Sequence, residues 1–133
     1  MKFMLMMHAP KAGWKEAGIG TWPVEDLMNH IRFMKDFAKE LAESGVLVGA
    51  EGLAGPEDAV VVRAQTGGAP AVTDGPFPET KEFLAGYWIV DVENEAQAYD
   101  VAGRASAAPG KGGVPLNMPI EVRQVMSAPP VEA

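Results

Sequence analysis

Hydrophobic residues gather in runs along the chain, and most of these runs have the length of a β-strand. The segment from residue 2 to residue 8 is continuously apolar apart from its ends, which is typical of a strand covered on both faces. Runs at 46–53 and 59–65 flank a Gly-Pro turn, and a Gly-Gly turn at 66–69 precedes a short strand at 70–74. We therefore predict a meander of three strands in this part of the chain.

The second half of the chain alternates between strand and helix patterns. Residues 83–92 are rich in Tyr, Trp, Ile and Val and predict a long strand, while 118–126 predict the last strand. Between them Asn94 is placed to cap a helix that ends near Ser106. The Pro- and Gly-rich stretch 107–117 predicts a loop, which we expect to be a flexible flap over a pocket.

The clearest helical pattern spans 23–44, with Pro23 in the first turn and Gly45 as a left-handed stop. Apolar residues recur along it at steps of four and three, forming the stripe Leu27, Ile31, Met34, Ala38 and Leu41. We expect this stripe to face the core, with His30 and Phe37 flanking it on one side.

The order of these elements is strand, helix, strand, strand with an extra hairpin arm, strand, helix, strand. This order predicts an α+β fold of the ferredoxin-like, split βαβ kind, in which both helices cover one face of an antiparallel sheet. The first strand and the 83–92 strand are apolar on both sides, so the second face would expose a large apolar patch. We therefore expect a homodimer whose sheets face each other. The chain is predicted to be a single domain over 1–127 with a tail at 128–133.

Composition and charge narrow the classes of function. A chain of 133 residues with 47% hydrophobic and 22% charged residues is about one folded domain. Its net charge of −7 repels phosphate backbones, so we expect no direct nucleic-acid partner. The absence of cysteine excludes disulfides, thiolate metal sites and cysteine nucleophiles. The N-terminus lacks the pattern of a signal peptide, and no stretch approaches the ~18 apolar residues that span a bilayer. We expect no membrane partner and a cytoplasmic location.

The stretch "VTDGPFPETKEFLAGYWIVDV" at 72–92 closely resembles the YCII-related family, in particular its DGPF-domain branch. The opening "MKFMLMMH", the segment "LVGAEGL" and the closing "IEVRQVM" extend the resemblance over most of the chain. The residues that match the motif are Asp74, Gly75, Pro76, Phe77, Glu79, Thr80, Lys81 and Glu82.

The resemblance implies a ferredoxin-like fold assembled as a dimeric α+β barrel. It implies little about activity, because members are largely uncharacterised. Some YCII-like proteins are suspected of enzymatic activity that involves a His-Asp pair, and some DGPF proteins resemble partners or neighbours of extracytoplasmic-function sigma factors.

The DGPF motif itself admits two interpretations. Asp74 can hydrogen-bond the backbone, Gly75 can take a positive φ and Pro76 presets the chain, so a turn explains these residues. Alternatively, the turn forms the rim of a pocket roofed by Phe77, with Asp74 as a catalytic candidate. Glu79, Lys81 and Glu82 are then ligand-binding candidates or a solvated charge cluster.

The two histidines are the other candidates for chemistry. His30 lies one helical turn after Asp26 and is a candidate general base oriented by that carboxylate, or a partly buried helical histidine. His8 ends the first strand, and Tyr87 places a hydroxyl on one face of the 83–92 strand, so both are ligand-binding candidates. No tight His/Glu spacing is present, and the "PGKGG" stretch lacks the spacing of a phosphate-binding loop. We expect neither a metal nor a cofactor.

Two functions from different classes follow from these observations. The first is a protein that binds a small organic ligand and catalyses cofactor-free acid/base chemistry of the isomerase or lyase type. The second is a non-catalytic regulatory or protein-binding module, which the resemblance would connect to sigma-factor-dependent transcription. A structural dimer without a ligand is a third alternative.

Overall fold

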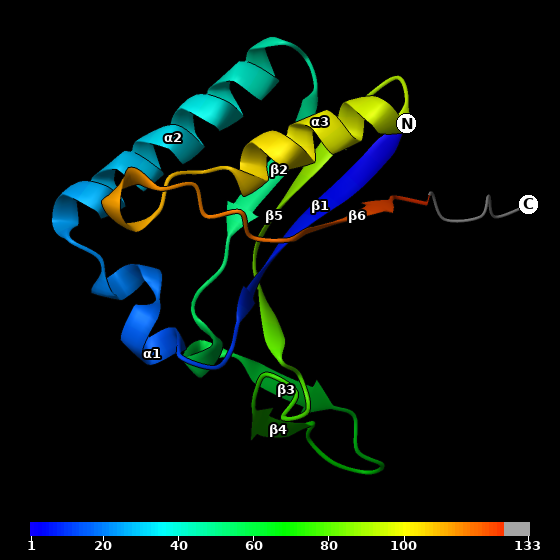
Figure 1. Ribbon diagram of the computed structural model, residues 1–133. Helices are drawn as coiled ribbons and strands as arrows, with labels where there is room; N and C mark the ends of the chain where they lie inside the picture. Colours follow the sequence, from blue (N-terminus) through cyan, green and yellow to red (C-terminus); the bar gives the residue numbers. More distant parts are fainter. Residues whose placement is uncertain (127–133) are drawn as a thin grey trace, which may run out of the picture.

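A four-stranded antiparallel sheet forms the body of the computed structural model, which describes residues 1–126 (Figure 1). The strand order is β2-β5-β1-β6. The bounds of these strands are Lys2–Pro10 for β1, Leu47–Gly52 for β2, Glu82–Asp91 for β5 and Ile120–Gln124 for β6. The tail predicted at 128–133 lies outside the described residues.

Two long helices, α2 (Val24–Glu43) and α3 (Glu95–Ser106), cover the same face of this sheet (Figure 1). The strand order places β5 between β1 and β2, and β1 between β5 and β6, as two interlocked split βαβ units require. The predicted α+β, ferredoxin-like fold is therefore confirmed. Shorter helical segments are α1 (Trp14–Ala17), η1 (Ile19–Thr21), η2 (Pro56–Asp58) and η3 (Lys111–Gly113).

The hairpin arm is a separate two-stranded sheet of β3 (Val60–Arg63) and β4 (Ala71–Asp74), which projects away from the body (Figure 1). The predicted three-stranded meander is wrong, because β2 pairs with β5 and not with β3. The amide of Leu53 still donates to the carbonyl of Ala85, at 2.9 Å. Beyond that bond η2 redirects the chain, so β3 begins outside the main sheet.

The core lies between the sheet and the helices, and strict alternation along β1 builds its sheet side. Phe3, Leu5, Met7 and Ala9 are buried, while the residues between them are partly buried or exposed. Leu5 is fully buried between its cross-strand neighbours Trp88 and Val122. From α3 the core receives a face of small residues: Ala98, Val101, Ala102 and Ala105. Asn94 caps this helix as predicted, because its side chain accepts the Gln97 amide at 3.0 Å.

The buried face of α2 differs from the predicted stripe. The buried residues are His30, Phe37 and Leu41, whereas Ile31 is 38% exposed. Apolar residues occupy a wide arc of this helix, and the aromatic ring of Phe37 takes the central position. Its ring packs edge-to-face on Trp88 with centroids 6.1 Å apart. His30 and Phe37 are therefore at the centre of the buried face, and the predicted stripe is displaced by about one residue.

Contacts between the two helices reinforce this orientation of α2. Arg104 of α3 donates to the Glu40 carboxylate at 2.6 Å, and its guanidinium carbon lies 4.9 Å from the centre of the Phe37 ring. The ion pair is exposed to solvent and contributes little by itself. Its main effect is to align the helices side by side over the sheet.

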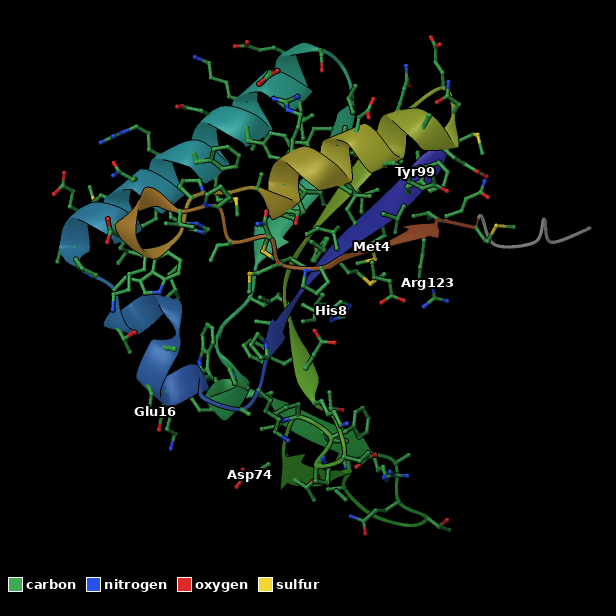
Figure 2. The ribbon with its side chains drawn as sticks, viewed as in Figure 1. Met4, His8, Glu16, Asp74, Tyr99 and Arg123 are labelled. Carbon is green, nitrogen blue, oxygen red and sulfur yellow. The ribbon has the colours of Figure 1, made fainter. Side chains whose placement is uncertain are left out.

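The opposite face of the sheet carries no helix among residues 1–126. Met4, Met6 and His8 of β1 point to this face, beside Ile89 and Tyr87 of β5. Its edge is polar, since Arg123 and Glu121 of β6 lie opposite Met4 and Met6. Figure 2 shows the side chains of Met4 and Arg123 on neighbouring strands. The helices therefore cover one face of β1. The other face is apolar along β1 and β5 and charged along the neighbouring edge strand β6.

No helix within residues 1–126 is both long enough and apolar enough to cross a lipid bilayer.

We predict that replacing Leu5 with Ala lowers the free energy of unfolding by about 2–5 kcal/mol, because the substitution leaves a cavity in the centre of the core. The measurement is denaturant unfolding followed by circular dichroism. The matched control is Leu53→Ala, since Leu53 is 46% exposed and its truncation should change stability by no more than ~0.5 kcal/mol. Equal effects of the two substitutions would contradict the placement of the core.

Candidate functional site

A cavity of about 740 Å³ lies on the helix-covered side of the sheet. Its walls come from the ends of β1 and β2, the middle of β5, the α1–η1 segment, the first half of α2 and the loop after α3. The aromatic and titratable residues of the lining include Trp14, Trp22, His30, Glu51, Phe83 and Trp88. Sequence reasoning did not assign the four aromatic residues among these to a site, although two tryptophans in a Gly-rich loop are a recognisable signal.

The α1–η1 segment forms the outer wall of the cavity. The amide of Gly18 donates to the Trp14 carbonyl at 2.7 Å, closing the short helix. A Cβ atom at Gly18 would lie only 2.5 Å from that carbonyl oxygen and 2.9 Å from the indole of Trp14. Glycine is therefore required for the chain to pass this close to Trp14. The result is that Trp14 packs edge-to-face on Phe83, with centroids 4.9 Å apart.

His30 is the buried polar side chain of the described core, with 8% of its surface exposed, and it lines the cavity. Its Nδ1 lies 2.9 Å from the carbonyl oxygen of Pro109. Because a carbonyl only accepts hydrogen bonds, Nδ1 carries the proton and donates it. Nε2 is then the acceptor of the neutral ring, and no group of residues 1–126 bonds to it. The indole of Trp22 packs edge-to-face on the imidazole at a centroid distance of 5.5 Å.

Asp26 does not orient His30, contrary to the sequence prediction. Its Oδ2 accepts the amide of Gly112 at 2.9 Å, so the carboxylate holds the loop after α3. Gly112 and Gly113 both have positive φ, which explains the glycine pair there. Asp26 and His30 lie on one edge of α2 as predicted, but each reaches across to this loop instead of to the other.

The loop after α3 is more structured than predicted, and it closes one side of the cavity. It contains η3 and a bridge between Pro109 and Pro115. The amide of Leu116 donates to the Ala108 carbonyl at 2.9 Å, and Leu116 lines the cavity. Its position agrees with a flap over the pocket.

The DGPF motif lies outside this cavity. Asp74 is exposed on the hairpin arm (Figure 2), Phe77 is 52% exposed, and Glu79, Lys81 and Glu82 are also exposed. None of these five candidates lines the cavity. These five side chains therefore do not form the rim of this cavity, while Gly75 and Pro76 of the turn border a second hollow of about 400 Å³ beside α1.

Local contacts explain the motif as the base of the hairpin arm. The Gly75 amide donates to the Ala59 carbonyl at 2.8 Å, and Lys11 Nζ donates to the carbonyls of Phe77 and Pro78 at 3.5 and 3.4 Å. Gly75 does not have the positive φ that we expected. A Cβ at this position would lie 3.1 Å from the Val61 side chain, so glycine fits this close approach without a shift of Val61.

The remaining two candidates, His8 and Tyr87, differ in their relation to the cavity. His8 lies on the open face of the sheet, where its Nε2 is 3.0 Å from Oε1 of Glu121 (Figure 2). Tyr87 is among the lining residues, although alternation along β5 places its side chain on the face opposite to Trp88. Of the nine candidate residues, His30 and Tyr87 therefore border the cavity, and Asp26 acts on its loop. Within residues 1–126 no group of three or more His, Asp or Glu residues is arranged to hold a metal ion.

We predict that neutral His30 carries its proton on Nδ1, because the Pro109 carbonyl accepts only from that atom. Two-bond ¹H–¹⁵N correlation spectra recorded above the titration range of the ring should show a protonated Nδ1 and an unprotonated Nε2. His8 is an internal control, because no backbone carbonyl fixes its ring. An unprotonated Nδ1 in His30 would refute the assignment.

Comparisons with known proteins agree with this architecture. The model of the YCII-related domain matches residues 1–114, which include the sheet strands β1, β2 and β5, the hairpin arm and both long helices. An uncharacterized protein of Rhizobium meliloti (strain 1021) is 29% identical over 103 residues, which are 77% of this chain and 82% of that protein. Membership of the DGPF branch and a cytoplasmic location stay predictions. Because the family model covers most of its length, the chain belongs to the YCII-related family.

Proposed function

We propose that this protein binds a small organic molecule in the cavity and that His30 acts there as the general base of a cofactor-free acid/base reaction. The observation that carries the proposal is a buried imidazole that lines an apolar cavity, with one ring nitrogen held by the Pro109 carbonyl and the other bonded to no group of residues 1–126. A volume of about 740 Å³ is in the range of pockets that enclose small ligands.

The reaction type follows from what the cavity contains. A neutral imidazole near pH 7 takes a proton through its unprotonated nitrogen, which is Nε2 in His30. Returning that proton to another carbon of the same molecule is an isomerisation, and expelling a neighbouring group is an elimination. Among the described lining residues there is no Ser, Thr, Cys, Lys or Asp to serve as a nucleophile, and the one carboxylate, Glu51, is exposed at the end of β2. This favours an isomerase or lyase over a hydrolase that works through a covalent intermediate.

Asp74, the second catalytic candidate from the sequence, has no part in this proposal because its side chain is exposed on the arm. The Nδ1 proton stays on the ring, hydrogen-bonded to the Pro109 carbonyl, throughout the reaction. That carbonyl stabilises the imidazolium after Nε2 has taken a proton, a role that the sequence had given to the Asp26 carboxylate.

One observation favours a second candidate function, that of a protein-binding module. The hairpin arm exposes Val60, Val62 and Val72, which are between 56 and 61% accessible. A two-stranded hairpin has little stability of its own, and exposed valines on it gain from contact with another protein. In this case His30 would be a buried structural histidine with no catalytic role.

We also propose that a second copy of the chain covers the open face of the sheet, as the sequence led us to expect. Met4, Met6, Tyr87 and Ile89 give that face an apolar centre, while the arrangement of Glu121 and Arg123 gives it a polar edge. Apolar centres with polar rims are typical of stable protein interfaces.

The acid/base proposal predicts that the protein accelerates exchange of acidic C–H protons with solvent deuterium. The probes are 2-tetralone and α-angelica lactone in D₂O, followed by ¹H NMR. His30→Gln should lower the rate by about 10²–10⁴-fold, because it removes the base. The matched control is His8→Gln, since His8 lies outside the cavity and its substitution should leave the rate unchanged. Exchange at the buffer rate for both probes, or equal rates in wild type and His30→Gln, would favour the binding-module function.

The dimer proposal predicts a solution mass of twice the chain mass by size-exclusion chromatography with light scattering. Ile89→Lys should shift the protein toward monomer, because it places a charge in the apolar centre of the open face. Val72→Lys makes the same change on the arm and should leave the dimer intact. A wild-type protein with the mass of one chain would rule out this interface.

A further inference from the structure

We infer that the cavity takes an uncharged, flat organic molecule with one hydroxyl group, a phenol or an enol, which donates its hydrogen bond to Nε2 of His30. The inference rests on the proposed function, because it concerns the same pocket. It adds the chemical class of the ligand, which follows from the charge, the shape and the polarity of the lining.

The charges around the cavity disfavour an anionic ligand. No Lys or Arg is among the lining residues that the structure describes, and the one carboxylate among them, Glu51, is exposed at the end of β2. A carboxylate or phosphate taken into this apolar site would lose its water without gaining a permanent cation. Lys11, the cation next to the α1 wall, directs its Nζ to the carbonyls of Phe77 and Pro78 instead. An uncharged molecule avoids this desolvation cost.

The aromatic lining favours a flat ligand. Trp14 and Phe83 meet at an interplanar angle of 79°, and Trp22 meets the His30 ring at 85°. These edge-to-face pairs present ring faces and ring edges in alternation, which is the arrangement that a further ring packs against favourably. Met7, Met34 and Met118 complete the lining with flexible, polarisable side chains that adapt to the outline of a ligand.

The hydrogen bond from His30 to the Pro109 carbonyl determines which polar group the ligand needs. With Nδ1 donating to Pro109, the neutral ring offers only an acceptor at Nε2. It cannot donate there to a ketone or an ether without breaking the bond to Pro109. A hydroxyl group satisfies Nε2, whereas an ether of the same shape leaves it buried without a partner. The pocket should therefore distinguish an alcohol from its methyl ether.

Three probes of similar shape test these points: 2-naphthol, 2-methoxynaphthalene and 2-naphthoate, titrated against the full-length protein by isothermal calorimetry at pH 7.5. We expect 2-naphthol to bind most tightly, with the ether and the carboxylate each roughly tenfold weaker, as the loss of one buried hydrogen bond or the burial of an unpaired charge implies. In His30→Phe, which fills a similar volume without an acceptor, naphthol and ether should bind equally.

The wild-type protein gives a second readout that needs no substitution. Saturation with 2-naphthol should shift the ¹⁵N resonance of Nε2 in His30 and leave that of His8 in place. Tightest binding by naphthoate would overturn the inference on charge, and equal binding of naphthol and ether would overturn the hydrogen bond to Nε2. Either result would leave a working ligand pocket. Failure of all three probes to bind would instead overturn the proposed pocket together with the inference.

Discussion

Nine residues of β1 pair with β5 in antiparallel register, from Lys2 opposite Asp91 to Pro10 opposite Glu82, and the edge strands β6 and β2 pair with the outer sides of these two strands. The pairing sets the alternation that sends Leu5 and Trp88 toward the helices. An irregularity between Met7 and His8 shifts the register by one residue, as a β-bulge does. The shift occurs beside the cavity, where it brings Ala85 and Gly86 into the lining. The site is thus built at the one place where the central ladder is irregular.

Much of the fold was predictable because local patterns specify it. Strand runs, the Asn94 cap and the order of elements led to the ferredoxin-like topology. The orientation of α2 was not predictable in the same way, since apolar residues cover a wide arc of that helix. Contacts of Phe37 with residues distant in sequence, Trp88 of β5 and Arg104 of α3, accompany the burial of this side of the helix. Likewise, nothing near β2 in the sequence indicates that its partner is β5 and that β3 leaves the sheet.

The candidate site was predicted in part, and the misses have a common cause. His30 was singled out on its helix and lines the cavity, but its partner is a backbone carbonyl, which no sequence pattern indicates. The DGPF motif attracted attention because its residues are chemically distinctive. Its glycine, however, meets a steric need against Val61, and its carbonyls receive Lys11. The DGPF motif is therefore explained by the geometry of a turn. The cavity of about 740 Å³ lies elsewhere and is lined by tryptophans that belong to no recognised motif.

The loop after α3 both borders the cavity and fixes the tautomer of the histidine that lines it. Pro109 fixes the proton on His30, and Gly112 is held by Asp26 one helical turn away, so a single short segment is anchored twice to the same helix. A ligand that enters by lifting this segment would break both bonds at once. The imidazole would then lose the hydrogen bond that holds its proton on Nδ1 and leaves Nε2 unprotonated. Closure of this loop over a bound ligand would therefore also set the tautomer of His30, because Nε2 is fixed as the unprotonated nitrogen while Pro109 accepts from Nδ1.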